Sequence, residues 1–243
     1  GRDAWLIEIT GGPGQDCDTC VDYTFDDLTD DYVPALLNGV LNFTNKDRLQ
    51  YVGFSNGCRA ALSSLEKNKF DSSKVETFVA VGCPGAFEGE SIGGTILNKD
   101  GSVAISRFKS QDKKHLTFGD VSKELLGLPL FSTNKDKISL NLFIQYYNFS
   151  SSNEDQQPCK NINLNKFYII QGTFNNNSDL IVTILDEDAI YKNINANKKQ
   201  YLSMTATHID LPDRDRAKAL IRKFVNNETL SWFEKTFILK SSS

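Results

Sequence analysis

The chain has 243 residues, of which 40% are hydrophobic and 24% are charged, enough to bury one sizeable core. Its 27 Lys and Arg residues against 31 Asp and Glu residues give a net charge of −4. General nucleic-acid binding is therefore disfavoured, because no basic excess is available to neutralise phosphates. Since no run of about 18 apolar residues occurs, the sequence predicts no transmembrane segment.

Five short segments have the composition of buried parallel strands, because each is β-rich and bounded by turn residues. In chain order they are residues 5–10 (WLIEIT), 49–54 (LQYVGF), 77–82 (TFVAVG), 167–172 (FYIIQG) and 201–205 (YLSMT). Helical patterns separate or follow them, at residues 26–41, 58–67, 186–192 and 213–226. Alternating strands and helices predict an α/β fold with a mostly parallel, doubly wound sheet.

Residues 87–165 interrupt this alternation. The segment is polar except for two apolar runs, at 124–131 (ELLGLPLF) and 138–149 (ISLNLFIQYYNF). Such a long connection is usually more than a loop, and its apolar runs need a surface to bury against. We expect residues 1–86 and 166–240 to form the core and residues 87–165 to form a cap or lid over it. The side chains expected to bind substrate are Leu128, Phe131, Phe143 and Tyr146.

A G-x-S-x-G pattern at residues 53–57 centres on Ser55. The pattern alone is weak, but it joins the end of a predicted strand to the start of a predicted helix. A sharp strand-to-helix turn needs small residues on both sides of the serine, so that its Oγ is exposed above the sheet. We therefore predict that Ser55 is a nucleophile. The backbone N–H of Asn56 is expected to stabilise the developing oxyanion.

A nucleophilic serine needs a base, and the chain has two histidines. His208 lies just after the last predicted strand and is the expected base. His115 lies in the insertion beside Lys113 and Lys114, a setting typical of a solvated surface histidine.

The orienting acid is expected after the strand that precedes the histidine. Asp179 lies in the polar turn after residues 167–172 and is the preferred candidate. Asp186 and Asp188 are alternatives, although their place at the start of a predicted helix is also typical of capping residues.

Ser55, Asp179 and His208 follow in the order nucleophile, acid, base, each after a predicted strand, and this pattern resembles the α/β-hydrolase family. The segments GTFNNNSDLIV, THIDLPDRDRAKALIRKFV and FVAVGCPGAFEG are similar to its acid loop, its histidine loop and the strand after its nucleophile helix. The resemblance implies a Ser-His-Asp hydrolase that needs no metal and no cofactor.

The expected substrate is a small-molecule ester, since the apolar runs of the insertion suit an apolar acyl or alcohol group. A serine peptidase acting on peptides, a thioesterase and a non-catalytic binding module of the same fold are the alternatives.

The chain departs from the family in having one predicted strand before the nucleophile strand. We expect residues 49–54 to pair on both sides, with residues 77–82 as one neighbour. The other neighbour is either residues 5–10, with Gly12 in the loop at residues 11–14 as an oxyanion donor, or an upstream segment of the same precursor. The upstream segment is the favoured expectation.

Five cysteines are present, and Cys17 and Cys20 form a C-x-x-C pair. A redox or zinc site needs further ligands or a thioredoxin-like context, so a local disulfide or ordinary thiols are expected here. Localisation stays open. A Cys17–Cys20 bridge and the absence of an initiator Met favour export, and a cytoplasmic enzyme fits nearly as well.

Overall fold

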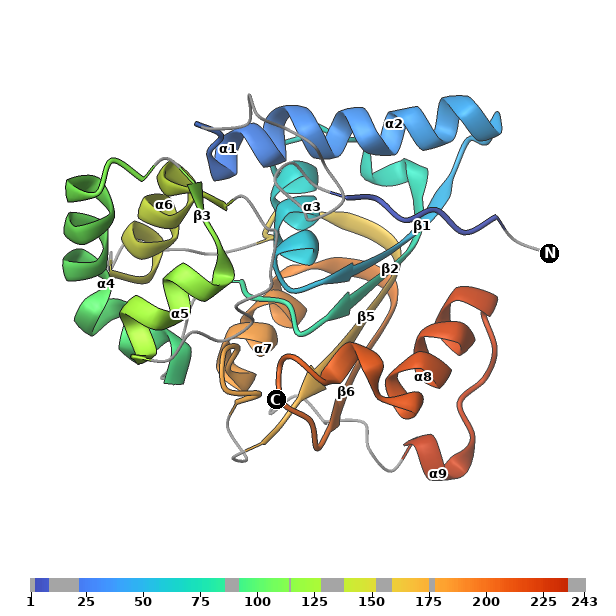
Figure 1. The fold of residues 1–243 in the computed structure, drawn as a ribbon. Coiled ribbons are helices and arrows are strands. Elements are labelled where there is room, and N and C mark those ends of the chain that lie inside the picture. The colour runs from blue at the N-terminus through green and yellow to red at the C-terminus, as the bar shows by residue number, and fades with distance from the viewer. Residues whose placement is uncertain are drawn as a thin grey trace. The chain divides into compact units, whose positions relative to one another are not determined.

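The computed structural model describes residues 3–8, 22–85, 92–113, 115–127, 138–151, 159–174 and 178–235. The chain divides into two compact units, one comprising residues 1–40 and 94–154 and the other residues 41–93 and 155–243. Figure 1 shows the helices and strands of both.

The unit of residues 41–93 and 155–243 is built on a parallel four-stranded sheet in the order β1-β2-β5-β6. Its strands are β1 (Leu49–Phe54), β2 (Val75–Val81), β5 (Asn163–Gly172) and β6 (Asn195–Met204). Strand β2 is buried along almost its whole length, as the apolar run at residues 78–81 predicts. The predicted parallel α/β sheet is confirmed.

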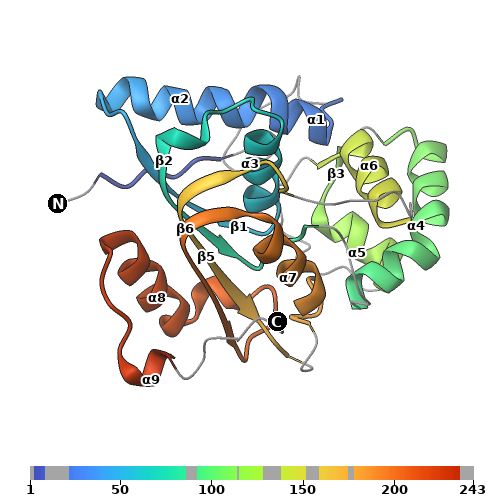
Figure 2. The same cartoon turned by 180° about the vertical axis from the view of Figure 1, so that it is seen from behind.

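Helices cover both faces of this sheet. The helices of this unit are α3 (Asn56–Glu66), α7 (Ile184–Asn193), α8 (Asp215–Asn226) and the short α9 (Trp232–Lys235), with 3₁₀ turns at Ser72–Lys74 and Leu211–Asp213. Helix α8 lies on the opposite side of the sheet from α3, as Figures 1 and 2 both show. The sheet is therefore doubly wound, as predicted.

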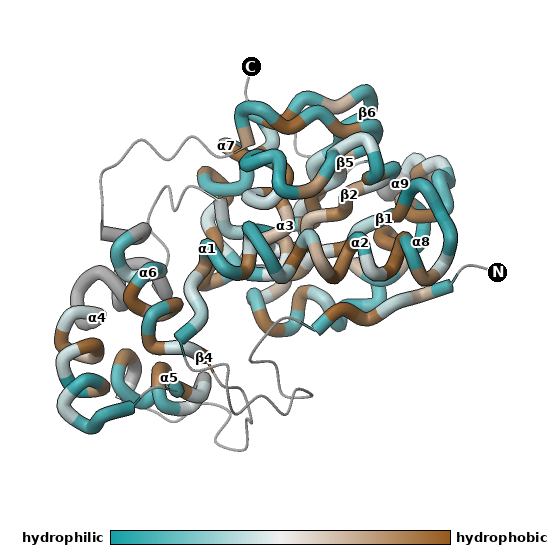
Figure 3. The backbone as a smooth tube through the Cα atoms, turned by 90° about the horizontal axis from the view of Figure 1, so that it is seen from above, coloured by the Kyte–Doolittle hydropathy of each residue, from teal (hydrophilic) through white to brown (hydrophobic). Residues whose placement is uncertain are grey.

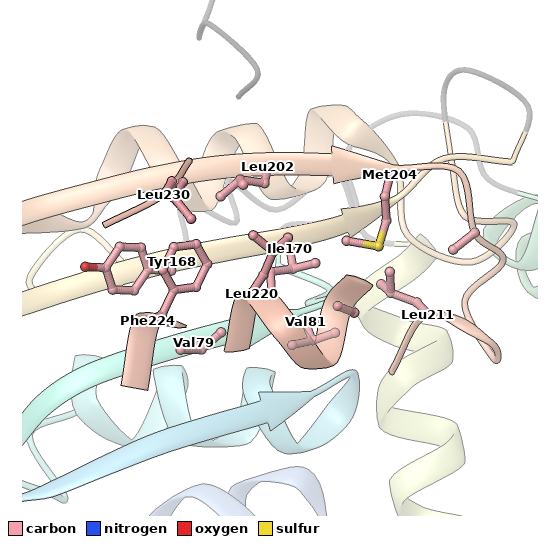
Figure 4. Packing of buried hydrophobic residues seen from close by; sticks show 12 residues of the cluster. Val79, Val81, Tyr168, Ile170, Leu202, Met204, Leu211, Leu220, Phe224 and Leu230 are labelled. Atoms are coloured by element: carbon pink, nitrogen blue, oxygen red, sulfur yellow. The ribbon is translucent and has the colours of Figure 1, made fainter. Parts of the chain in front are cut away.

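The core between α8 and the sheet shows why these segments pack. Alternate residues of β2, β5 and β6 point to the same face, in keeping with the two-residue period of a strand. They meet the apolar side of α8, and the Tyr168 ring stacks on Phe224 at a centroid distance of 4.0 Å (Figure 4). Helix α8 carries both hydrophilic and hydrophobic residues (Figure 3). Its buried residues, Ala217, Leu220 and Phe224, are three or four residues apart, as a helix with one buried face requires.

The unit of residues 1–40 and 94–154 is mainly helical. Its elements are α1 (Phe25–Asp27), a π-helical turn (Leu28–Tyr32), α2 (Val33–Thr44, which continues into the sheet-bearing unit), α4 (Ile92–Ser110), β3 (His115–Leu116), α5 (Phe118–Leu126), β4 (Ile138–Ser139) and α6 (Leu140–Ser151). Within residues 94–154 a small hydrophobic core is formed by Ala104, Phe108, Leu116 and Phe143. The expected domain boundaries at residues 86–87 and 165–166 stay a prediction.

The strand predicted at residues 5–10 is wrong for the part that the structure describes. Residues 3–8 have no regular secondary structure, and Leu6 is 98% exposed. Residues 9 and 10 lie outside the described ranges. Strand-forming composition indicates a side-chain preference, but a strand also needs a hydrogen-bonded neighbour, which the composition does not supply.

The prediction that residues 49–54 pair on both sides is met on one side only among the described strands. Strand β1 pairs in parallel with β2, and it lies at the edge of the described sheet.

None of the helices in the described ranges is long and apolar enough to cross a membrane.

Candidate active site

Ser55 lies in a sharp turn between β1 and α3. Its backbone has a φ of 49° and a ψ of −123°, a conformation that residues other than glycine rarely adopt. The turn is held by the Ser55 N–H, which donates to the carbonyl of Val81 at 3.0 Å. A Cβ at Gly53 would lie 2.6 Å from the Cα of Cys58, so only glycine fits there. These are the geometric requirements that the G-x-S-x-G pattern predicts.

His208 lies beside Ser55, in the segment that follows β6. Its Nε2 is 2.8 Å from the Oγ of Ser55, and its side chain is almost completely buried. The ring of Phe54 packs on the imidazole at a centroid distance of 5.0 Å. The serine hydroxyl is thus within hydrogen-bonding distance of a histidine whose orientation is restrained by packing.

Asp179 holds the other side of the imidazole. Its Oδ2 is 2.6 Å from the Nδ1 of His208, and the residue is 0% exposed. Its Oδ1 accepts the backbone N–H groups of Ile181 at 3.0 Å and Val182 at 2.7 Å. The backbone N–H of His208 also donates to the carbonyl of Asp179 at 2.7 Å. These contacts fix the carboxylate and the histidine to each other.

The tautomer follows from these contacts. A buried carboxylate accepts a hydrogen bond, so the Nδ1–H of His208 donates to Asp179 and leaves Nε2 as an acceptor for the hydroxyl of Ser55. The line of three groups can remove the proton from the serine oxygen and stabilise the imidazolium that forms.

Asn56 begins α3, directly after the serine. The N–H groups of the first helical turn have no acceptor within their own helix and carry a partial positive charge. The backbone N–H of Asn56 belongs to this turn. Its side-chain Oδ1 is buried and has no hydrogen-bond partner among the described residues.

No protein-family model matches the sequence, and no curated protein matches it. Among solved structures, the esterase EaEST from Exiguobacterium antarcticum has a TM-score of 0.51 at 14% identity, over 84% of this chain and 76% of the esterase. MGS-M2, an α/β hydrolase enzyme from a Medee basin deep-sea metagenome library, has a TM-score of 0.50 at 17% identity, over 82% of this chain and 72% of that chain.

The chain has the α/β-hydrolase fold.

Within this hydrolase fold, the three aspartates that the sequence offered as the orienting acid have different partners. Asp179 contacts His208. Asp186 instead accepts the backbone N–H of Gly85 at 2.9 Å. Asp188 forms an ion pair with Lys192 on its own helix at 2.6 Å. The other histidine, His115, lies in the two-residue strand β3.

Two of the remaining predicted site residues, Phe143 and Tyr146, have described partners within the mainly helical unit. Gly12, Leu128 and Phe131 lie outside the described residues. Phe143 is buried against Phe108 in the core of the mainly helical unit. Tyr146 packs edge-on against the ring of Phe25 at 5.8 Å. Their proposed contact with substrate stays a prediction.

Three features of this site were not predicted from the sequence. Cys58, in the first turn of α3, forms a disulfide with Cys83, just after β2. Gly82 has a φ of 52°, and a Cβ there would lie 3.3 Å from the Oδ2 of Asp179. Tyr51 donates its hydroxyl to the carbonyl of Gly57 at 2.8 Å, and burial raises its pKa to about 12. In the sequence, the pair Gly82-Cys83 directly after a predicted buried strand was the only feature that pointed to them.

Metal binding has no evident site in the described ranges. No group of three or more His, Cys, Asp or Glu side chains there is arranged to hold a metal ion. Cys17 and Cys20 lie outside the described residues, and Cys159 is a buried free thiol whose pKa is raised by burial.

Proposed function

We propose that this protein is a serine hydrolase that cleaves a carboxylic ester through an acyl-enzyme. The observation that carries the proposal is the continuous line from the Oγ of Ser55 through the imidazole of His208 to the carboxylate of Asp179. The similarity to hydrolase structures supports the fold on which the proposal rests.

The proposed reaction has two halves. His208 removes the proton of Ser55 as its oxygen attacks the carbonyl carbon, and Asp179 stabilises the resulting imidazolium. The imidazolium then donates its proton to the leaving alcohol, and an ester bond joins the acyl group to Ser55. In the second half His208 activates a water molecule, which releases the acid and restores the serine.

The oxyanion of each tetrahedral intermediate needs hydrogen-bond donors. We assign the backbone N–H of Asn56 to this role, because it lies at the start of α3, directly after the nucleophile. Gly12 is kept as the proposed second donor.

An ester is the proposed substrate, and a peptide or a thioester is the alternative within the same mechanism. We further propose that residues 87–165 form a cap that selects the acyl chain, as their two apolar runs suggest. Deleting the segment should change the preference for chain length more than the reactivity toward a small activated ester. An unchanged chain-length preference would contradict the cap role.

The test is covalent labelling of Ser55. The folded protein should react with a fluorophosphonate probe, and mass spectrometry should locate the adduct on Ser55. Ser55→Ala should abolish labelling, and His208→Ala should slow it strongly while leaving a cooperative thermal transition. Matched ester, thioester and peptide substrates should then show the ester with the highest kcat/KM.

A folded protein that reacts with neither the probe nor an activated ester would support the non-catalytic module instead. Labelling at a serine other than Ser55 would also contradict the proposal.

A further inference from the structure

Two acidic side chains lie in the interior at the start of α7. Glu187 is 0% exposed and Asp186 is 2% exposed. Acidic residues in a first helical turn ordinarily face water. There they interact favourably with the helix dipole and remain hydrated. A carboxyl group that is fully buried needs polar partners to be retained there.

The partners of these acids are backbone groups of one turn, residues 82–85, which follows β2. The Oε1 of Glu187 accepts the N–H of Cys83 at 2.6 Å, and the Oδ2 of Asp186 accepts the N–H of Gly85 at 2.9 Å. The Oε2 of Glu187 has no hydrogen-bond partner in the part of the chain that the structure describes. Glu187 therefore holds the turn at Cys83, and Asp186 holds it at Gly85.

The same turn is attached to the nucleophile on its other side. The disulfide of Cys83 joins it to Cys58, three residues after Ser55. The carbonyl of Val81, just before the turn, accepts the N–H of Ser55 at 3.0 Å. A displacement of the turn would consequently be transmitted to Ser55.

The turn also touches the histidine and its acid. A Cβ at Gly82 would lie 3.3 Å from the Oδ2 of Asp179 and 3.3 Å from the Nδ1 of His208. These are the two atoms that form the 2.6 Å contact between the carboxylate and the imidazole. Gly82 therefore faces that contact, with room for a hydrogen but little room for a larger group, and the position of the turn bears on the space around the pair.

We propose that Glu187 is a positioning residue: by accepting the N–H of Cys83 it fixes the turn at residues 82–85 against the Asp179–His208 pair and the Ser55 turn. The consequence for reaction rate rests on the proposed hydrolase function; the consequence for the geometry of the imidazole does not.

The surroundings of Glu187 favour the protonated form of its carboxyl group over the charged form. Burial raises its pKa well above the ordinary value, the bond from Cys83 lowers it by less, and the charges of Asp179 and Asp186 raise it further. A neutral carboxyl group keeps its Oε1 as an acceptor and adds no negative charge beside Asp179. The amide of glutamine reproduces both properties, so the acceptor and the charge can be tested separately.

The experiment compares four variants of the full chain. Glu187→Met removes the acceptor at similar volume, Glu187→Gln keeps it, and Glu187→Asp shortens the side chain by one methylene. Asp188→Asn is the matched control, because Asp188 is the next residue of α7 and pairs with Lys192 instead of the turn. Each variant is first checked for a cooperative thermal transition.

Two readouts are used. The first is the rate of fluorophosphonate labelling at Ser55, with kcat and KM for a small activated ester. The second is the far-downfield proton resonance of the Nδ1–H of His208, identified by its loss in His208→Ala, which reports the imidazole–carboxylate contact without requiring turnover.

We expect Glu187→Met to lower kcat and the labelling rate by about 10- to 100-fold, with little change in KM, and to shift or broaden the resonance. Glu187→Gln should stay within about threefold of the wild type, because it keeps the acceptor. Asp188→Asn should match the wild type. Should Glu187→Met not fold, Glu187→Asp decides by the same two readouts.

The two proposals fail in different ways. A cooperatively folded Glu187→Met, or in its place Glu187→Asp, with wild-type kcat and an unchanged resonance would overturn the positioning role and leave the hydrolase function standing. A wild-type protein that is never labelled would contradict the hydrolase function. In that case the resonance alone would test the positioning role. A shifted signal in the variant would support the role, and an unchanged signal would contradict it.

Discussion

Gly82 lies against His208 so closely that a Cβ at Gly82 would be 3.3 Å from both the Nδ1 and the Cε1 of the imidazole. The same Cβ would be 3.3 Å from the Oδ2 of Asp179, and the backbone there has a φ of 52°. The position therefore combines a conformation that favours glycine with a contact to both partners of one hydrogen bond.

Gly82→Ala tests this relationship. We expect the labelling rate of Ser55 to fall by about tenfold or more, because the added methyl group displaces the imidazole or the carboxylate. The strained φ should also lower the free energy of unfolding by about 1–2 kcal/mol. Gly39→Ala in α2 is the control, since nothing lies within 4 Å of its Cβ. Wild-type labelling of a folded Gly82→Ala would contradict the proposed contact.

Asp179→Asn should separate the acids that the sequence left open. An amide cannot stabilise the imidazolium, and it favours the wrong tautomer of His208, so kcat should fall by about 10⁴-fold with little change in stability. Asp188→Asn should leave kcat near the wild-type value. Steady-state hydrolysis of an activated ester measures both, and a wild-type kcat in a folded Asp179→Asn would remove Asp179 from the proposed mechanism.

The disulfide between Cys58 and Cys83 closes a loop with a sequence separation of 25 residues. Tryptic mapping without reductant should find these two cysteines in one cross-linked peptide. Replacing both by alanine should lower the free energy of unfolding by on the order of 3 kcal/mol, because the unfolded chain gains freedom. Denaturant titration measures this loss. Recovery of Cys58 and Cys83 as free thiols from the folded protein would refute the pairing.

A cluster around Glu76 predicts an acid-sensitive contribution to stability. The hydrogen bond from Lys166, at 2.8 Å, is the largest cause that lowers the pKa of Glu76, and bonds from Asn165 and Arg48 add to it. Because the folded protein holds this carboxylate ionised more strongly than the unfolded chain, the stabilisation is present above the ordinary pKa of 4.5 and is lost as pH falls through the folded value.

Glu76→Gln measures that contribution. At pH 7 the variant should be less stable than the wild type by about 1 kcal/mol, since the site is partly open to solvent. The difference should shrink as pH falls below 4.5, the ordinary value for glutamate. Denaturant unfolding at a series of pH values gives the curve, and a difference that grows toward low pH would have the wrong sign.

Much of the fold could be predicted from local sequence. Residues 49–54 form β1 as predicted, and the apolar runs at 77–82, 167–172 and 201–205 lie in or overlap β2, β5 and β6. Strand β2 and the second half of β5 are almost completely buried, and such segments have nearly continuous apolar sequences, which a single window of residues reveals. Residues 5–10 had the same composition, and the described part of them forms no strand, because pairing depends on a neighbour elsewhere in the chain.

The candidate site, like the fold, could be predicted from the sequence only in part. The sequence by itself determined that a serine sits in a strand-to-helix turn, since the small residues around Ser55 are a local steric requirement. It also limited the base to two histidines and the preferred acid to one of three aspartates. Only the tertiary structure decided that Asp179 meets His208, that Cys58 pairs with Cys83 and that Gly82 and Glu187 border the site. Each of these is a contact between residues far apart in the chain, and its partner is chosen by packing, which no short segment encodes.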